Sequence, residues 1–334
     1  MPEPLCAIVI GASAGGVDAL RAIVADLPET LNAAVFVTLH IGTHRSDLPW
    51  LLGRAGLLNA SHAIDGDPIR TGQIYVAPPD HHLVVDAGRM NLTKGPRENW
   101  ARPAIDPLFR SAARAYGPNV IGVILTGGLN DGTAGMFEVK SRGGITVVQD
   151  PAEAINPQMP QSVIDNVRVD HVVPVGQIGA LLTDLVARHS ASTPAIIHPT
   201  GDSQERGMTA EFTSHRPVAV TCPDCGGALR RSELGTLTQF SCHIGHVYTA
   251  EVMLAAQFLA MERSVEMARR SLGERAELCR QMQAKLTPTV QNGKVQSQWE
   301  GAEYEALAQA ELLEQLLTRE WIHPARAHPG ARDT

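Results

Sequence analysis

The chain has 334 residues, of which 44% are hydrophobic, and it carries a formal net charge of -7 at pH 7. This length and hydrophobic content fit one large domain with extensions or two domains, and they exclude a chain disordered throughout. The net negative charge, with no concentrated basic stretch, argues against nucleic-acid binding by bulk electrostatics. The N-terminus Met1-Pro2-Glu3-Pro4 lacks a hydrophobic signal-peptide region and no run of about 18 apolar residues occurs, so we expect no secretion signal and no membrane insertion.

The five cysteines are unevenly distributed along the chain. Cys6 and Cys279 are isolated, whereas Cys222, Cys225 and Cys242 are clustered. This pattern is not that of a disulfide framework and suits a reducing compartment. We therefore expect a cytoplasmic protein.

An apolar run, Ala7–Ile10, leads into the turn Gly11-Ala12-Ser13-Ala14-Gly15-Gly16, and a helical pattern begins at Val17. The pattern predicts a buried strand, a tight glycine turn and a helix N-terminus. Ser13 lies at the crest of this turn, where nearby helix amides can stabilise negative charge. The turn either cradles a phosphate or presents Ser13 as a nucleophile beside an oxyanion hole, and both alternatives stay open on this stretch alone.

From Leu5 to about Val186, short β-rich runs alternate with helical stretches. The predicted strands are Ala7–Ile10, Ala34–Leu39, Gln73–Ala77, His82–Asp86, Val120–Leu125 and Ile145–Gln149. The predicted helices are Gly16–Ala25, Asp47–Gly56, Asp106–Tyr116, Asp131–Ser141 and Ile178–His189. Continuously apolar strands in alternation with helices favour an α/β fold, a doubly wound, mostly parallel, Rossmann-like sheet covered on both faces. We expect the short strands near residues 73–86 to form a small inserted hairpin.

Three predicted strands are followed by polar residues suited to chemistry, namely Ser13, His40 and Asp131. In a doubly wound sheet these strand ends can converge, and together they supply the nucleophile, base and carboxylate of a triad. Taken singly, Ser13 and Asp131 fit helix caps and His40 fits a structural position at the sheet edge. The stretch Gly11–Gly15 matches the G-x-S-x-G elbow, but the order Ser–His–Asp differs from that of the α/β-hydrolases.

Five separated motifs follow one another in a characteristic order and spacing. They are Gly11-Ala12-Ser13-Ala14-Gly15-Gly16, the strand ending in His40, Tyr75-Val76-Ala77-Pro78-Pro79-Asp80-His81-His82, Arg102-Pro103-Ala104-Ile105-Asp106-Pro107-Leu108-Phe109, and Gly122-Val123-Ile124-Leu125-Thr126-Gly127 with Asp131-Gly132. Over about residues 5–186 the chain resembles the catalytic domain of the bacterial chemotaxis protein-glutamate methylesterase (CheB-type). The resemblance implies hydrolysis of glutamate γ-methyl esters on methyl-accepting chemotaxis receptors, or on a related sensory protein, with release of methanol. In that family the glutamine side-chain amide is also hydrolysed.

The resemblance also implies roles for individual residues. Ser13 would be the nucleophile, His40 its general base and Asp131 the carboxylate that orients the imidazole. The backbone amides of Ala14 and Gly128 would form the oxyanion hole, and no cofactor would take part in catalysis. Arg102, in the Arg-Pro segment, would contact the substrate.

The sequence departs from the family pattern in two places near the predicted site. Ala14 stands where the family commonly has threonine, and Thr126-Gly127-Gly128-Leu129 stands for Thr-Gly-Met-Gly. A backbone donor survives both changes, although the lost side chains can alter rate or substrate choice. The alternative function is therefore a catalytically weakened regulatory or adaptor protein. Because the first predicted strand starts at residue 7, we also expect a stand-alone form without the phospho-receiver domain that most members carry.

The second half of the chain begins with a stretch rich in Ser, Thr, Pro and Gly, which predicts a linker over 189–217 after a catalytic domain over 1–188. The Cys222-x2-Cys225 knuckle and Cys242 with a following histidine have the spacing of a structural Zn2+ site in a zinc-ribbon-like module over 218–250. We expect His246 to be the fourth ligand, with His243 as the alternative. A coincidental group of buried thiols is the competing interpretation.

Apolar residues at 3–4 spacing predict a long helix over 251–286 and a second over 298–321, separated by a break at 287–297. They are Leu254, Phe258, Met261, Val265, Ala268, Leu272, Cys279, Met282 and Leu286 in the first helix and Ala306, Ala310, Leu313, Leu317 and Trp321 in the second. We expect an internal α-helical hairpin in a coiled-coil region over 251–323, followed by a flexible tail over 324–334. The alternative is a surface over 251–321 for a second copy or a partner helix.

Overall fold

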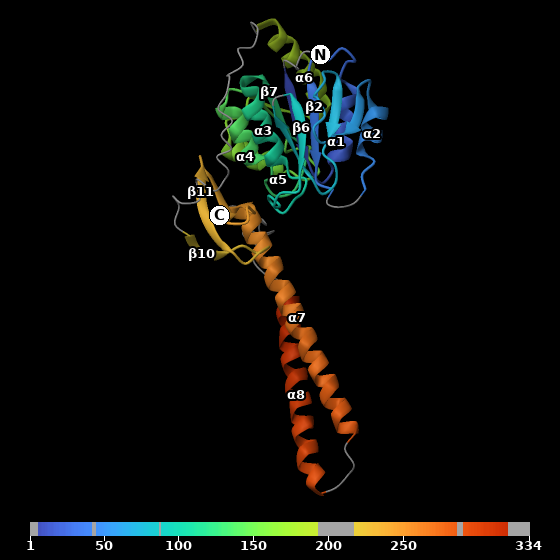
Figure 1. The fold of residues 1–334 in the computed structure, drawn as a ribbon, viewed down its shortest axis with the longest axis vertical. Helices are drawn as coiled ribbons and strands as arrows, with labels where there is room; N and C mark the ends of the chain where they lie inside the picture. Colours follow the sequence, from blue (N-terminus) through green and yellow to red (C-terminus); the bar gives the residue numbers. More distant parts are fainter. Residues whose placement is uncertain (1–5, 42–44, 87, 193–216, 286–289, 320–334) are drawn as a thin grey trace, which may run out of the picture. The chain divides into compact units, whose positions relative to one another are not determined.

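The structure is a computed structural model that describes residues 6–41, 45–86, 88–192, 217–285 and 290–319 (Figure 1). The predicted tail over 324–334 and most of the predicted linker lie outside the described residues. The chain forms two compact units, Met1–Met253 and Leu254–Thr334. The first contains the α/β sheet and the cysteine-containing module, and the second contains most of the two long helices.

The first unit is built on a seven-stranded sheet in the order β3-β4-β2-β1-β7-β8-β9, in which neighbouring strands pair in parallel. Its strands are β1 (Ala7–Ala12), β2 (Ala34–Leu39), β3 (Asn59–His62), β4 (Gln73–Val76), β7 (Val120–Ile124), β8 (Ile145–Gln149) and β9 (His171–Val173). Every residue of β1, β2 and β7 is buried, because helices cover both faces of the sheet. The prediction of a doubly wound parallel sheet is confirmed.

The helices divide between the two faces of the sheet (Figure 1). One apolar cluster joins the sheet to α1 (Gly16–Ala25), α2 (Leu48–Ala55) and α6 (Val175–Ser192). The other joins it to α3 (Ile105–Tyr116), α4 (Thr133–Ser141) and α5 (Gln158–Asn166). A short 3-10 turn, η1 (Gly117–Asn119), leads from α3 into β7.

The strand order reverses between β1 and β7, which lie side by side at the centre of the sheet. Such a switch point opens a crevice beyond the carboxyl ends of the strands. The Ser13 turn follows β1, the 126–131 loop follows β7, and His40 follows the adjacent β2. The topology therefore brings the three predicted site segments to one edge of the sheet.

The predicted small hairpin is present, but of the two strands predicted near residues 73–86 only the second belongs to it. β4 joins the main sheet beside β2, and the hairpin consists of β5 (His82–Asp86) and β6 (Arg89–Thr93). The sequence-based prediction also misses β3, β6, β9 and α5. β3 has the sequence Asn-Ala-Ser-His and alternates between exposed and half-buried positions, so it carries no apolar run.

The cysteine-containing module is a four-stranded antiparallel sheet in the order β10-β11-β12-β13. Its strands are β10 (Pro217–Thr221), β11 (Ala228–Leu234), β12 (Leu237–Cys242) and β13 (Val247–Thr249). Helix α7 (Ala250–Ala284) follows β13 directly, and α8 (Val290–Thr318) completes the helical pair.

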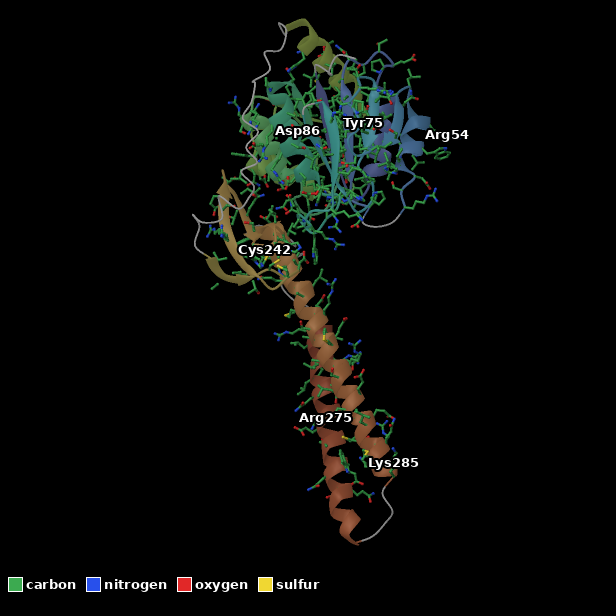
Figure 2. All side chains as sticks on the ribbon, viewed as in Figure 1. Arg54, Tyr75, Asp86, Cys242, Arg275 and Lys285 are labelled. Atoms are coloured by element: carbon green, nitrogen blue, oxygen red, sulfur yellow. The ribbon has the colours of Figure 1, made fainter. Side chains whose placement is uncertain are left out.

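The two long helices contact each other, as the predicted hairpin requires. Arg280 Nε donates to Glu303 Oε1 at 3.0 Å, and Gln283 Nε2 donates to Glu303 Oε2 at 2.8 Å. Ala276, Cys279 and Ala306 are buried between them, whereas Arg275 and Lys285 project into solvent (Figure 2). Because α8 begins at Val290, the predicted break at 287–297 is too long. Among the described residues, no helix is both long enough and apolar enough to cross a membrane.

Candidate active site and metal site

His40 and Asp131, predicted from separate strand ends, are in direct contact. His40 Nε2 lies 2.7 Å from Asp131 Oδ2, and the His40 backbone N–H donates to the Ala12 carbonyl at the end of β1 at 3.3 Å. Because a carboxylate only accepts hydrogen bonds, Nε2 carries the shared proton. Nδ1 is left as the ring nitrogen with a lone pair.

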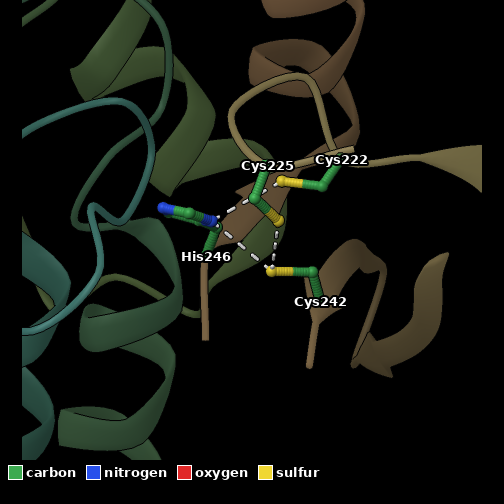
Figure 3. A group of neighbouring side chains, drawn as sticks. All are labelled: Cys222, Cys225, Cys242 and His246. Atoms are coloured by element: carbon green, nitrogen blue, oxygen red, sulfur yellow. Dashed lines mark hydrogen bonds between the residues drawn. The ribbon is translucent and has the colours of Figure 1, made fainter. Parts of the chain in front are cut away.

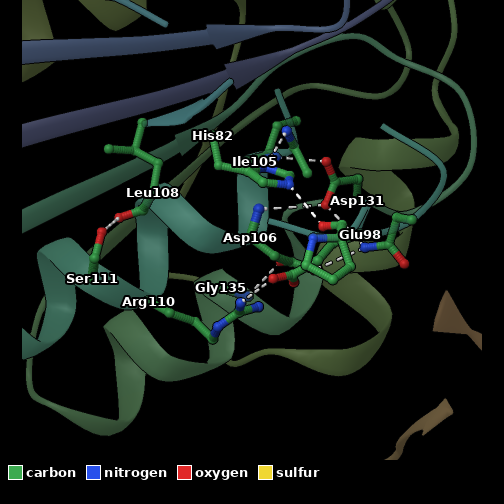
Figure 4. A network of polar contacts seen from close by, with 12 residues as sticks. His82, Glu98, Ile105, Asp106, Leu108, Arg110, Ser111, Asp131 and Gly135 are labelled. Carbon is green, nitrogen blue, oxygen red and sulfur yellow. Dashed lines mark hydrogen bonds and ion pairs between the residues drawn. The ribbon is translucent and has the colours of Figure 1, made fainter. Parts of the chain in front are cut away.

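Asp131 is almost fully buried and is surrounded by donors (Figure 4). Its Oδ2 accepts the Ile105 N–H at 2.6 Å, and its Oδ1 accepts Asn99 Nδ2 at 2.9 Å and the Gly132 N–H at 3.0 Å. Ile105 is the first residue of α3, so the carboxylate lies at a helix N-terminus, where negative charge is favoured. Burial would raise the pKa of Asp131, but His40 and the other donors together hold this pKa below its ordinary value.

A second carboxyl, Asp106, lies beside Asp131 and is completely buried. It accepts the Gly135 N–H at 2.7 Å and shares the Asn99 amide, which donates to Asp106 Oδ2 at 2.9 Å. Burial and the neighbouring charge of Asp131 raise the pKa of Asp106 well above its ordinary value. The pKa values of the two neighbouring carboxyls are therefore shifted in opposite directions.

The Ser13 turn packs directly against the loop that leads to Asp131. The Ser13 N–H donates to the Thr126 carbonyl at 3.0 Å, and a Cβ placed on Gly127 would lie 2.8 Å from Ser13 Cβ. Gly15 adopts a φ of 78°, which a side chain disfavours and which closes the turn onto α1. Ser13 is half-buried, and its hydroxyl has no hydrogen-bond partner among the described residues, so its contact with His40 stays a prediction.

The two amides predicted for the oxyanion hole are not used by the protein itself. Gly127 N–H donates to the Asn156 carbonyl at 3.0 Å and Leu129 N–H donates to Gln158 Oε1 at 2.9 Å. Within the described parts of the chain, the N–H groups of Ala14 and Gly128 have no such partner. Amides without an internal partner are what the predicted oxyanion hole requires.

A hollow of about 270 Å³ opens beside His40. Apart from His40 it is lined by one segment, Arg97, Asn99, Trp100, Ala101, Arg102 and Pro103. The His82 ring holds this segment at both ends, because its Nε2 donates to the Pro96 carbonyl at 3.0 Å and its Nδ1 accepts the Ala104 N–H at 3.2 Å. The wall of the hollow is thus anchored to β5.

Arg102 lies in this wall, but its guanidinium is already hydrogen-bonded to other groups of the protein. Nε and Nη2 both donate to Asp80 Oδ1, at 2.9 Å and 2.7 Å, and Nη1 donates to the Gly95 carbonyl at 2.9 Å. These bonds fit a role in shaping the hollow. The predicted contact between Arg102 and substrate stays a prediction.

Sequence reasoning missed Asn99, whose amide joins the two buried carboxyls. Asn99 and Trp100 both have positive φ, of 47° and 68°, a conformation that costs free energy and recurs at functional sites. The asparagine was a weak signal, since Asn tolerates the left-handed region better than most residues. Asp106 belongs to the Arg102–Phe109 motif, but the sequence alone is equally consistent with an ordinary acidic residue in the first turn of a helix.

The cysteine-containing module brings Cys222, Cys225, Cys242 and His246 together (Figure 3). Their ligand atoms all lie within 4.8 Å of one another, with His246 Nδ1 3.6 Å from Cys222 Sγ and 3.5 Å from Cys242 Sγ. A tetrahedral zinc ion with ordinary bond lengths sets sulfur–nitrogen separations of about 3.5 Å. His243, the alternative ligand, is exposed and lies outside the group.

Local backbone geometry accounts for this grouping. Cys222 N–H donates to the Gly227 carbonyl and Gly226 N–H donates to the Cys222 carbonyl, both at 2.8 Å, so the first knuckle is a tight turn. The second knuckle is closed by Cys242 N–H, which donates to the His246 carbonyl at 3.1 Å. The donor set and its spacing fit a structural Cys3His metal site.

Comparison with known proteins places the α/β part of the chain among related sequences. The CheB methylesterase family matches residues 8–182. A relative from Leptospira interrogans is 39% identical over 182 residues, which cover 54% of this chain and 94% of the relative. A Pyrococcus abyssi protein named protein-glutamate methylesterase/protein-glutamine glutaminase is 37% identical over 178 residues, which cover 52% of this chain and 48% of that protein.

A solved structure agrees with the sequence relatives. The crystal structure of the Thermotoga maritima CheB methylesterase catalytic domain has a TM-score of 0.53 at 34% identity. It covers 54% of this chain and 98% of that domain. The family match ends before the Cys3His module begins.

Proposed function

The chain belongs to the CheB methylesterase family, and from this premise we propose that it is a serine esterase acting on glutamate γ-methyl esters of methylated chemoreceptors. The observation that carries the proposal is the part-buried 2.7 Å contact between His40 and Asp131, beside the Ser13 turn. The names of the relatives support a second leaving group, ammonia from a glutamine side chain.

The first half of the reaction forms a covalent intermediate. Ser13 Oγ attacks the ester carbonyl carbon while its proton passes to Nδ1 of His40, the nitrogen that Asp131 leaves available. Asp131, held ionised by its donors, stabilises the imidazolium that forms. The amides of Ala14 and Gly128 bind the oxyanion, and the intermediate collapses to a Ser13 glutamyl ester as His40 returns the proton to methoxide, which leaves as methanol.

The second half reverses these roles with water as the nucleophile. His40 takes a proton from water, the resulting hydroxide adds to the glutamyl ester, and the proton returns to Ser13 Oγ as the C–O bond breaks. The product is an unmodified glutamate side chain. The free cysteines of the described residues fit a reducing, cytoplasmic site of action.

The test is methanol release from methylated receptor by purified protein. The Ser13→Ala variant should lose at least about 1,000-fold in kcat, as removal of a triad nucleophile does elsewhere. Ser141→Ala, at an exposed position near the end of α4, is the matched control and should retain full activity. Equal methanol release by wild type and Ser13→Ala would sink the mechanism, and no release by wild type would sink the activity.

We also infer that the Cys3His group binds one structural Zn2+ ion, because four protein ligands fill a tetrahedral shell and leave no open position. Protein purified under mild conditions should contain about one equivalent of zinc, and Cys242→Ser should contain little. His243→Ala, which alters the exposed histidine, should retain the metal. Zinc content well below half an equivalent in the wild type would contradict the assignment.

A further inference from the structure

The Cys3His module contacts the loop that carries Asn99 within the first compact unit. Glu98 pairs with Val247 of β13 as a parallel bridge, and the Asn99 N–H donates to the Val247 carbonyl at 2.8 Å. The Thr249 N–H donates in turn to the side-chain oxygen of Asn99 at 3.1 Å. Asn99 is thus held on its backbone and on its side chain by one short strand.

The same asparagine side chain reaches the triad carboxylate from its other end. Its Nδ2 donates to Asp131 Oδ1, while its Oδ1 accepts from Thr249, so the amide cannot flip without losing both bonds. A series of hydrogen bonds therefore runs from β13 through Asn99 and Asp131 to His40. Asn99 and Asp131 are both almost fully buried, which makes a lost partner costly.

A second contact reaches the residue next to Asp131. Thr249 Oγ1 donates to Asn130 Oδ1 at 2.6 Å, and Asn130 Nδ2 donates to Glu251 Oε2 at 2.6 Å. Thr249 Oγ1 also accepts the Val252 N–H at 3.4 Å at the start of α7. Thr249 therefore holds the side chain of Asn130, the residue that precedes Asp131 in the chain, as well as the side chain of Asn99.

The candidate metal ligands lie immediately beside these contacts. His246 directly precedes Val247, whose carbonyl bonds Asn99, and Tyr248 places its hydroxyl 3.4 Å from Cys222 Sγ. A bound ion that fixes Cys242 and His246 would also fix the start of β13. Loss of the ion would free β13 from its register against Glu98 and Asn99.

We propose that the Cys3His module is a metal-dependent brace of the catalytic carboxylate, with Asn99 and Thr249 as the positioning residues that connect the two. This proposal assumes the esterase function proposed above, because the carboxylate that the module holds is the one assigned to the triad. The module contacts Glu98 and Asn99, and Asn99 belongs to the segment that lines the hollow beside His40. Metal loading would thus act on the rate of the chemical step.

The first experiment compares Thr249→Val with Thr249→Ser in the zinc-loaded full chain. The valine variant loses the hydroxyl that bonds Asn130, whereas the serine variant keeps it. We expect Thr249→Val to lower kcat by about tenfold, the effect of one buried hydrogen bond, with KM unchanged because Thr249 does not line the hollow. Thr249→Ser should have the kcat of the wild type. Thr238→Val, on β12 of the same module, should also leave kcat unchanged.

The second experiment removes and restores zinc in the wild type. We expect kcat to fall on removal and to recover on reloading. Hydrogen exchange of the Asn99 amide should accelerate in parallel, while the buried amides of β1 stay protected. The downfield proton resonance between His40 Nε2 and Asp131 should broaden in the zinc-free protein and in Thr249→Val.

The outcomes separate the brace from the esterase function. One outcome refutes the brace and leaves the esterase standing. Methanol release would then depend on Ser13, while zinc removal and Thr249→Val would leave kcat, the Asn99 exchange rate and the His40 resonance unchanged. If no methanol is released, the esterase fails, and the brace is judged by the exchange rate and the resonance alone. A fall in kcat that Thr249→Ser reproduces in full would also refute the role of the hydroxyl.

Discussion

Replacement of Gly127 by alanine should disable the predicted nucleophile, Ser13, without changing any residue of the predicted triad. An alanine Cβ at this position would lie 2.8 Å from Ser13 Cβ and 2.0 Å from Met159 Sδ. The methionine side chain is flexible and can move aside. Ser13 Cβ is fixed to a turn whose N–H bonds the Thr126 carbonyl, so relief of that contact must shift the turn itself.

The magnitude follows from the geometry. Carbon atoms in ordinary contact lie about 3.5–4.0 Å apart, so the turn must move by about 1 Å. A displacement of about 1 Å at a reacting atom costs about 100-fold in rate, or about 2.7 kcal/mol of transition-state stabilisation. Overpacking should lower the free energy of unfolding by about 1–3 kcal/mol as well.

Gly128→Ala is the control on the next residue. Its Cβ would lie 3.3 Å from Asn156 Nδ2 and 3.6 Å from Gln158 Oε1, so a shift of a few tenths of an ångström in these side-chain ends accommodates it. The backbone amide of residue 128 survives the change, so activity should stay within about threefold of wild type. Methanol release and thermal unfolding of both variants give the comparison. Full activity in Gly127→Ala, or equal loss in both variants, would refute the packing argument.

Three further predictions concern buried and paired groups. Asp131→Asn should lower kcat by about 10,000-fold, because the amide NH2 would face groups that can only donate hydrogen bonds. The check is the rate of methanol release, measured on variant protein whose circular dichroism spectrum shows that it is folded. Burial raises the pKa of Cys6 to about 12, so iodoacetamide should not alkylate it in the native protein at pH 8 but should do so in denaturant; rapid native labelling would contradict this. The hydrogen bonds from Arg102 hold the pKa of Asp80 below its ordinary value, so the pair stabilises the fold at neutral pH and this contribution is lost as the pH falls through the lowered pKa. Asp80→Asn should therefore unfold at lower temperature than wild type at pH 7, with the gap closing in acid below about pH 4, and a gap that persists there would count against the pairing.

Much of the fold was available from local patterns. The strands at residues 7–12, 34–39 and 120–124 contain almost no polar residue, which favours burial on both faces and so predicts a parallel sheet. Local patterns failed where burial was partial. The edge strand β3 has no apolar run, and β4 is no longer than the hairpin strands, so only its pairing with β2 distinguishes it from them.

The candidate site divides in the same way. Chain order and strand ends pointed to Ser13, His40 and Asp131 because residues at the carboxyl ends of parallel strands share one edge. Cysteine spacing pointed to the Cys3His group because a tetrahedral ion demands short loops between ligands. Each of these inferences rests on a constraint that acts over a few residues or along one sheet edge.

The sequence by itself determined the sheet, the order of the predicted triad and the grouping of the metal-ligand candidates. Only the tertiary structure decided that Asn99 lies between Asp131 and Thr249, 150 positions later in the chain. No local pattern encodes such a contact, since a single side-chain amide can bond any buried carboxylate or backbone N–H that packing brings near it. Packing likewise separated Asp106 from Asp131, because two adjacent buried carboxyls acquire different pKa values from the donors and charges that the fold places around each.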